Sequence, residues 1–291
     1  MTLADLVLSH TSRLENFEML THTPMTDRRR VILLGLAVAT FSLSGVHAAA
    51  DPDSPYDSLL KRYVKPGSDG INRVDYAGWK ANAADLAALD AYIDEMSRRR
   101  PTNMPRNVAF AYWGNLYNAL TLKVVLDRYP VASIRDIKSD SWLDPKAYTG
   151  PWRQRRVTVE GRRLSLDDIE HVIMRPTFKD PRVHYVVNCA SYGCPNLMNR
   201  VWRASTLDAD LDDAARAFVN HPRGVTVLPS GSLKVSSIYK WFIEDFGGND
   251  AGLIAHFRAF AKPELSRRLA TAPRIAEDDY DWSLNRVRPN S

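Results

Sequence analysis

The stretch at residues 165–201 reads SLDDIEHVIMRPTFKDPRVHYVVNCASYGCPNLMNRV. It contains both cysteines of the chain, Cys189 and Cys194, together with His171 and His184. Apolar segments precede and follow it. Reactive side chains gathered this densely in the middle of a chain indicate a functional site, and the rest of the sequence is interpreted around them.

The two cysteines are expected to end a strand and to begin a helix. Residues 183–189, VHYVVNC, are rich in β-branched side chains and predict a strand that ends at Cys189. Pro195 follows Cys194, and proline is favoured at the first position of a helix. If residues 196–201 are helical, the Cys194 sulfur lies at a positive helix end, where a thiolate is favoured. Ser191 belongs to the tight reversal between the cysteines.

A reactive thiolate needs a proton acceptor or a cation nearby, and the nearest candidates in sequence are His171 and His184. Glu170 is a further candidate for the catalytic group. Adjacent residues on a helix do not face each other, so the carboxylate that orients His171 is expected from Asp167, from Asp168 or from a distant part of the chain.

Ser165 and Asp168 predict the start of the helix that carries these residues. The serine is suited to the N-cap position, and the aspartate three residues later gives a carboxylate version of the capping box. The helix is expected to run to residue 174 and to stop at Pro176.

Three interpretations of the cysteines remain open. In the first, Cys194 is a nucleophile that attacks an acyl group while a histidine moves the proton. In the second, Cys189 and Cys194 form a structural or redox-active disulfide, as cysteines of exported proteins usually do. In the third, His184 and the two cysteines bind a metal, although their spacing is long for zinc and no fourth ligand is evident.

Residues 25–50 have the layout of an export signal, in which arginines precede an apolar run and an A-x-A cleavage site. Residues 1–24 then lie upstream of the expected initiator, Met25. We expect cleavage after residue 50 and a periplasmic protein, exported by the general or the twin-arginine route. The apolar run is shorter than a membrane span, so no span is expected after cleavage.

Residues 51–291 are long enough for a single domain with a sizeable core. The formal net charge of the chain is only +5, and its basic residues are spread along the sequence. The basic clusters at residues 98–100 and 153–156 are not interleaved with aromatic residues, so nucleic acid is not an expected partner. No cofactor is predicted, and a peptide or an envelope component is the class of partner that export would allow.

Residues 107–129 predict the longest apolar helix, with Asn115 and Asn118 on one face. A buried asparagine must be hydrogen-bonded, so this pair is expected to hold a neighbouring loop or to bind a substrate amide.

Residues 79–98 predict a further amphipathic helix, and residues 155–164 predict a hairpin across a Glu160–Gly161 turn. The aromatic residues Tyr239, Trp241, Phe242 and Phe246 have helical spacing and are expected in the core. Helices and short hairpins mix along the chain without a regular βαβ rhythm. The sequence therefore predicts a helix-rich α+β fold.

Six motifs along the chain are distinctive: AYWGNLYNALT at 111–121, LSLDDIEH at 164–171, DPRVHY at 180–185, CASYGCP at 189–195, YKWF at 239–242 and YDWSLN at 280–285. With these motifs the chain resembles the domain of unknown function 547 family. The family carries no established activity, so the resemblance implies a shared domain without a reaction. Its bacterial members look like exported proteins, in agreement with the predicted signal.

The sequence thus predicts a single exported α+β domain with a papain-like or transglutaminase-like cysteine site. Cys194 is the expected nucleophile, with His171 or His184 as the base. Whether the protein is an enzyme stays open at this point. The alternatives are an envelope binding module with a Cys189–Cys194 disulfide and a thiol–disulfide exchange protein.

Overall fold

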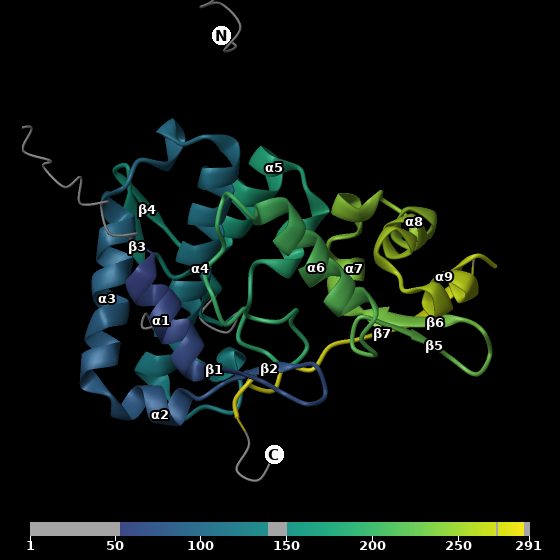
Figure 1. Cartoon of the computed structure of the whole chain (residues 1–291), viewed down its shortest axis with the longest axis horizontal. Helices are drawn as coiled ribbons and strands as arrows, with labels where there is room; N and C mark the ends of the chain where they lie inside the picture. The colour runs from purple at the N-terminus through teal and green to yellow at the C-terminus, as the bar shows by residue number, and fades with distance from the viewer. Residues whose placement is uncertain (1–52, 139–149, 272, 288–291) are drawn as a thin grey trace, which may run out of the picture. The chain divides into compact units, whose positions relative to one another are not determined.

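The computed structural model describes residues 53–138, 150–271 and 273–287 (Figure 1). All of them belong to one compact unit, residues 49–291. The predicted export signal at 25–50 and the residues before it lie outside the described part of the chain. Across the described residues, helices and three small sheets make up the fold, which confirms the predicted α+β class.

Helix α4 (Arg106–Arg128) lies in the middle of the larger hydrophobic core. Apolar side chains cover most of its circumference, so it is buried on several sides, as the sequence predicted. Two helices pack against it, α2 (Tyr76–Ala81) and α3 (Ala83–Arg98), and α1 (Ser54–Tyr63) packs in turn against these two (Figure 1). The Asn82 side chain accepts the Asp85 N–H and starts α3, so the single helix predicted over 79–98 is two helices.

Two antiparallel hairpins flank this helical core. Strand β1 (Val64–Pro66) pairs with β2 (Asn72–Val74), and β3 (Val157–Val159) pairs with β4 (Arg162–Leu164). The second hairpin turns at Glu160 and Gly161, where the sequence predicted it.

A second core surrounds a three-stranded sheet. Its strands are β5 (Val225–Val227), β6 (Leu233–Ser236) and β7 (Ile275–Asp279). Strand β6 pairs antiparallel with β5 and parallel with β7. The helices of this part of the unit are α6 (Leu207–Val219), α7 (Ser237–Trp241), α8 (Asp250–Phe260) and α9 (Pro263–Leu269).

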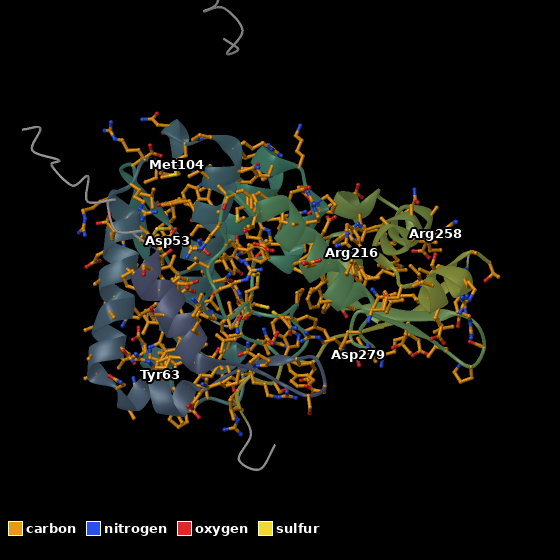
Figure 2. All side chains as sticks on the ribbon, viewed as in Figure 1. Asp53, Tyr63, Met104, Arg216, Arg258 and Asp279 are labelled. Carbon is orange, nitrogen blue, oxygen red and sulfur yellow. The ribbon has the colours of Figure 1, made fainter. Side chains whose placement is uncertain are left out.

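The C-terminal segment, residues 280–287, connects the two cores. It leaves β7 at Asp279, labelled in Figure 2, and returns to β2, where the Val74 N–H donates to the Asn285 carbonyl at 2.8 Å. On the way, the Leu284 N–H donates to the Ala132 carbonyl at 2.8 Å. The segment therefore crosses the loop that holds the cysteines, and its side chains can reach the site.

Two predicted elements next to the cysteines are absent. Residues 183–189 do not form a strand, because a 3-10 helix, η6 (Pro181–Tyr185), leads directly into an irregular loop. Residues 196–201 contain no helix. The Asn196 side chain there bonds the Asn72 N–H and the Gly70 carbonyl, so this segment is tied to the β1–β2 hairpin.

The helix predicted from residue 165 is present in an altered form. The Ser165 hydroxyl accepts the Asp168 N–H, and the Asp168 carboxylate accepts the Ser165 N–H, so the capping box is confirmed. The helix then widens into a π-helix, η5 (Asp168–Met174). It does not stop at Pro176, because α5 (Arg175–Phe178) continues it with the proline in its first turn.

Candidate functional site

The loop from Cys189 to Cys194 is held by hydrogen bonds from three directions. The Asn118 side chain of α4 donates to the Val186 carbonyl and accepts the Asn188 N–H, both at 2.9 Å. The Asn188 side chain accepts the Ala190 N–H at 2.8 Å and donates to the Pro195 carbonyl at 2.8 Å. Ala190 has a φ of 59°, an uncommon conformation for a residue with a side chain.

The C-terminal segment supplies the third direction. The Tyr192 N–H donates to the Ser283 carbonyl at 2.7 Å, and the Gly193 N–H donates to the Asp281 carbonyl at 2.8 Å. Gly193 has no Cβ, and this absence allows the close approach. A Cβ there would lie 2.9 Å from the Asp281 nitrogen and 3.0 Å from its oxygen.

Both cysteines are free thiols whose sulfur atoms lie 2.6 Å apart. A disulfide bond is about 2.05 Å long, so the disulfide considered from the sequence is not formed in this structure. The Cys194 sulfur accepts the Cys189 N–H at 3.1 Å and the Ser191 hydroxyl at 3.3 Å. The Tyr280 hydroxyl lies 3.0 Å from each sulfur and 2.5 Å from the Ser191 oxygen.

These donors stabilise a negative charge on Cys194. Burial alone would raise the pKa of the Cys194 thiol, but hydrogen bonds from Cys189, Ser191 and Tyr280 outweigh it and lower the pKa to about 6. The pKa of Cys189 is raised, first because its thiol bonds to Cys194 and then because of burial. At neutral pH the pair therefore holds one proton on Cys189 and one charge on Cys194. The stabilisation that the sequence assigned to a helix end comes from these donors instead.

A cavity of about 620 Å³ opens onto the two sulfurs. Cys194 is buried and Cys189 is partly exposed. Carboxylate and histidine side chains line one part of the cavity, and aromatic side chains line another. The side chains that line it include Tyr117, Arg135, Trp152, Arg153, Asp167, Glu170, His171, His184, Trp241, Phe242, Tyr280 and Trp282.

Glu170 and His184 form the polar wall. Glu170 is buried and accepts the Tyr117 hydroxyl at 3.1 Å, and burial raises the pKa of its carboxyl group. His184 is buried against the Phe242 ring and bonds through Nε2 to the Asp245 carboxylate at 2.6 Å. Burial lowers the pKa of His184 although Asp245 opposes the shift, so the imidazole is neutral at pH 7. Its Nδ1 lies 3.9 Å from the Glu170 carboxylate.

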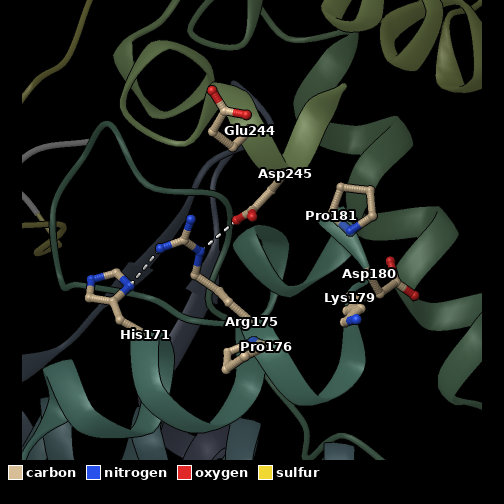
Figure 3. Close-up of a pocket in the computed structure, with 8 residues that line it drawn as sticks. All are labelled: His171, Arg175, Pro176, Lys179, Asp180, Pro181, Glu244 and Asp245. Atoms are coloured by element: carbon tan, nitrogen blue, oxygen red, sulfur yellow. Dashed lines mark hydrogen bonds and ion pairs between the residues drawn. The ribbon is translucent and has the colours of Figure 1, made fainter. Parts of the chain in front are cut away.

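His171 lies where the cavity adjoins a second one of about 450 Å³, shown in Figure 3. The Arg175 guanidinium bridges the His171 ring, at 3.3 Å, and the Asp245 carboxylate, at 2.5 Å. Burial raises the pKa of the Asp245 carboxyl, but bonds from His184 and Arg175 outweigh it and lower the pKa. The two histidines are thus connected through one arginine and one carboxylate.

The π-helix explains how adjacent residues share the cavity. On a regular helix Glu170 and His171 would diverge, yet both line this cavity, with 3.9 Å between the His171 Nδ1 and the Glu170 carboxylate. Asp167 lies 3.7 Å from the His171 Nε2, whereas Asp168 serves as the cap. A distant carboxylate, Asp245, bonds the other histidine.

The structure brings most of the predicted site residues together. Cys189, Cys194, His171, His184 and Glu170 line one cavity, and Ser191 bonds the Cys194 sulfur. Within the described residues, neither imidazole makes a hydrogen bond to a sulfur. Asn115 lies elsewhere, since its side chain bonds the Trp202 backbone twice at 2.9 Å.

Sequence reasoning did not assign Tyr280, Asp245, Trp152 or Trp241 to the site. Trp241 was interpreted as core, but its side chain is 49% exposed and lines the cavity. Tyr280 follows the last strand and is far from the cysteines in sequence. The YDWSLN and YKWF motifs were the available signal, because they place aromatic residues beside polar ones in segments that the family resemblance already marked.

The fold and the site define a helix-rich α+β domain with two thiols at the base of an aromatic-walled cavity. A family model described as "Protein of unknown function, DUF547" matches residues 101–219, which confirms the family resemblance over that segment. The segment includes α4 and both cysteines; Tyr280 and Trp241 lie beyond it. No curated protein and no solved structure matches the chain.

Two further properties hold for the part of the chain that the structure describes. No group of three or more histidine, cysteine, aspartate or glutamate side chains there is arranged to hold a metal ion. Across the same residues, none of the helices combines the length and the apolar character that crossing a bilayer requires.

Proposed function

We propose that this protein carries out thiol–disulfide exchange with Cys189 and Cys194 as its reactive pair. The observation that carries the proposal is the contact of two free sulfurs, 2.6 Å apart, at the base of a cavity. Forming a disulfide from this position needs a movement of only about half an ångström. A lone nucleophile would gain nothing from a second thiol at that distance, whereas exchange requires one.

In the proposed reaction the Cys194 thiolate attacks one sulfur of a substrate disulfide. A Cys194–substrate disulfide forms, the substrate S–S bond breaks, and the leaving thiolate takes the proton of Cys189. The new Cys189 thiolate then attacks the Cys194 sulfur, closes the Cys189–Cys194 disulfide and releases the second substrate thiolate. One substrate disulfide becomes a thiol and a thiolate while the protein dithiol is oxidised, so atoms, charge and electrons balance.

The hydrogen bonds around the sulfurs support this order of events. Cys194 has the lowered pKa and supplies the thiolate at neutral pH. Cys189 keeps its proton, so it can protonate the leaving group. Tyr280 lies 3.0 Å from both sulfurs and can donate to whichever one carries the charge.

Stoichiometric reaction with dithiobis(nitrobenzoate) tests the proposal. The reduced, folded protein should release two thionitrobenzoate ions per chain and end with no bound nitrobenzoate, its intact mass lower by two hydrogen atoms. Cys189→Ser should release one ion and keep one nitrobenzoate on Cys194. Wild-type protein that keeps two nitrobenzoate groups, or that does not react while folded, would contradict the exchange.

Cys194→Ser is the matched control for the roles of the two sulfurs. The remaining Cys189 sulfur lies 3.6 Å from the Ser191 oxygen and 3.0 Å from the Tyr280 hydroxyl, whereas Cys194 in Cys189→Ser keeps the backbone N–H of residue 189, the Ser191 hydroxyl and the Tyr280 hydroxyl within 3.3 Å. With fewer close donors, Cys189 should react at neutral pH more slowly than Cys194 does in Cys189→Ser. The reverse order of rates would assign the first attack to Cys189.

A second candidate is hydrolysis of an amide or ester by Cys194 alone. The observation that favours it is the pair of Glu170 and His184 in the same cavity, with Asp245 bonded to His184 from behind. A papain-like or transglutaminase-like fold, and a peptide or another envelope component as substrate, would accompany this candidate. It requires Cys189→Ser to keep full catalytic activity, whereas thiol exchange requires that variant to stop after one step.

We place either activity in the periplasm, on the strength of the predicted signal at residues 25–50. An oxidising compartment supplies the disulfide substrates that the exchange reaction needs. Expression with residues 1–50 followed by cell fractionation tests this location, and a cytoplasmic, uncleaved product would contradict it.

A further inference from the structure

We infer that the cavity selects substrates in which the reacting disulfide is attached to a flat ring that carries a carboxylate. This substrate class rests on the proposed exchange reaction. The flat ring follows from the indole wall of the cavity, and the carboxylate follows from a guanidinium that lies against one ring of that wall.

Three tryptophans form the ring-binding wall. Trp241 and Trp282 stack with centroids 5.7 Å apart and planes 26° apart, and Trp152 meets Trp282 edge-on at 5.7 Å. These residues come from three separate segments and converge on one cavity. Trp241 stays 49% exposed, and a large apolar ring that faces an open cavity marks a binding surface. Indole faces favour flat rings, which gain both area and stacking geometry.

The wall runs from the thiols to Arg135. Tyr280 contacts both sulfurs through its hydroxyl, and its ring lies 4.6 Å from the Trp282 ring. Beyond it, the Arg135 guanidinium lies 5.2 Å from the centre of the Trp282 ring. The thiolate and the guanidinium are therefore linked through two neighbouring aromatic rings, Tyr280 and Trp282, and a ligand that contacts both rings can reach both groups.

Arg135 has no carboxylate partner among the residues that the structure describes. Arg153, the other cation of this cavity, lies 3.9 Å from the Asp167 carboxylate. An exposed guanidinium stacked on an aromatic face is placed to pair with a carboxylate from a ligand. A carboxylate at the base would instead meet the Cys194 thiolate, so its favourable position is at the Arg135 end. The volume of about 620 Å³ suits a small ligand.

The first test of this selectivity measures ligand binding to a variant that lacks both thiols and cannot react. In the Cys189→Ser/Cys194→Ser double variant, calorimetric titration compares naphthoate with naphthylmethanol, which lacks the carboxylate, and with decahydronaphthoate, which lacks the flat ring. Naphthoate should bind about tenfold more tightly than either. Arg135→Gln should remove the preference for naphthoate over naphthylmethanol, and Arg153→Gln should keep it. Equal affinity for naphthoate and decahydronaphthoate, or no binding at all, would overturn the inference.

Reaction rates of the wild-type dithiol test it a second time. The probes are dithiobis(nitrobenzoate), with ring and carboxylate, dithiodipyridine, with ring only, and dithiodipropionate, with carboxylate only. Each rate is divided by the rate of glutathione with the same probe, which removes intrinsic reactivity. The rate ratio for dithiobis(nitrobenzoate) should exceed the ratios for the other two probes by about tenfold. Equal ratios would overturn the substrate class and leave the exchange reaction standing, whereas failure of all three probes to oxidise the dithiol would overturn the exchange itself.

Discussion

The Tyr280 hydroxyl has one proton and three acceptors within hydrogen-bond distance: Ser191 and both sulfurs. Burial and the neighbouring thiols raise the pKa of Tyr280, so it keeps this proton. At the scale of single residues, the charge on Cys194 therefore depends on a side chain from the end of the chain. No local pattern around the cysteines could reveal that dependence.

Removing that hydroxyl should make the thiolate less stable. In Tyr280→Phe we expect the pKa of Cys194 to rise by about one unit, since a hydrogen bond to a charged group is worth roughly 1.5–3 kcal/mol. The pH dependence of alkylation by iodoacetamide, measured in the Cys189→Ser background, gives the value. Tyr192→Phe is the control, because its hydroxyl bonds Asp69 rather than a sulfur. An unchanged pKa of Cys194 in Tyr280→Phe would show that the Tyr280 hydroxyl does not stabilise the thiolate.

At the scale of elements, α4 holds two loops with two equivalent asparagines. Asn115 and Asn118 are both buried, and each makes two hydrogen bonds of 2.9 Å to backbone. Asn118 bonds the segment that enters Cys189, whereas Asn115 bonds Trp202. Substituting each asparagine in turn therefore distinguishes an effect on the stability of the fold from an effect on the geometry of the cysteine loop.

Asn115→Ala and Asn118→Ala should each lower the free energy of unfolding by about 2 kcal/mol or more, because each leaves buried backbone groups without partners. Only Asn118→Ala should also slow alkylation of Cys194 at neutral pH. Urea unfolding and alkylation of the folded variants measure the two effects. Equal slowing in both variants would mean that the alkylation rate follows stability alone.

The contact between Gly193 and the C-terminal segment also positions the site, because it sets where Tyr280 lies. A methyl group on Gly193 would lie within 3.0 Å of Asp281 backbone atoms and the Tyr280 ring. Gly193→Ala should therefore displace Tyr280, raise the pKa of Cys194 and destabilise the fold by roughly 1–3 kcal/mol. Gly231→Ala is the matched control, since it introduces strain at a φ of 84° in a hairpin turn with open space around it. A normal alkylation profile in Gly193→Ala would refute the positioning role.

The elements that sequence predicted well are those fixed by local chemistry. The capping box at Ser165, the buried α4 and the β3–β4 hairpin follow from patterns within a few residues. The strand predicted over 183–189 fails because Asn118 binds its backbone groups, so tertiary hydrogen bonds override β propensity. The helix predicted over 196–201 fails for a similar reason. Most of the candidate site residues still lie together although the predicted strand and helix are absent, because they were chosen by residue type and not by secondary structure.

At the scale of the whole molecule, the thiol pair couples stability to pH. The pKa of Cys194 in the folded protein, about 6, is below the unfolded value of about 8.5, so its contribution is full above the unfolded value and is lost as pH falls through 6. The raised pKa of Cys189 acts in the opposite direction, and its contribution is lost as pH rises above the unfolded value.

The stability difference between reduced wild type and the Cys189→Ser/Cys194→Ser double variant should therefore rise from pH 6 to about pH 8.5 and fall at higher pH. Other titrating groups are common to both proteins and cancel in the difference. Urea unfolding under reducing conditions at a series of pH values measures it. A difference that is flat between these limits would mean that the thiols carry no charge linked to folding.

The chemistry proposed for this site depends on one thiolate, on Cys194, being present at neutral pH in the reduced protein. Thiolate absorbance at about 240 nm, titrated with pH, measures this directly. Wild type should gain one thiolate per chain with a midpoint of about 6, and Cys194→Ser should gain none in that range. A wild-type titration that shows no thiolate until pH rises to about 8.5, as for an ordinary cysteine, would contradict the account.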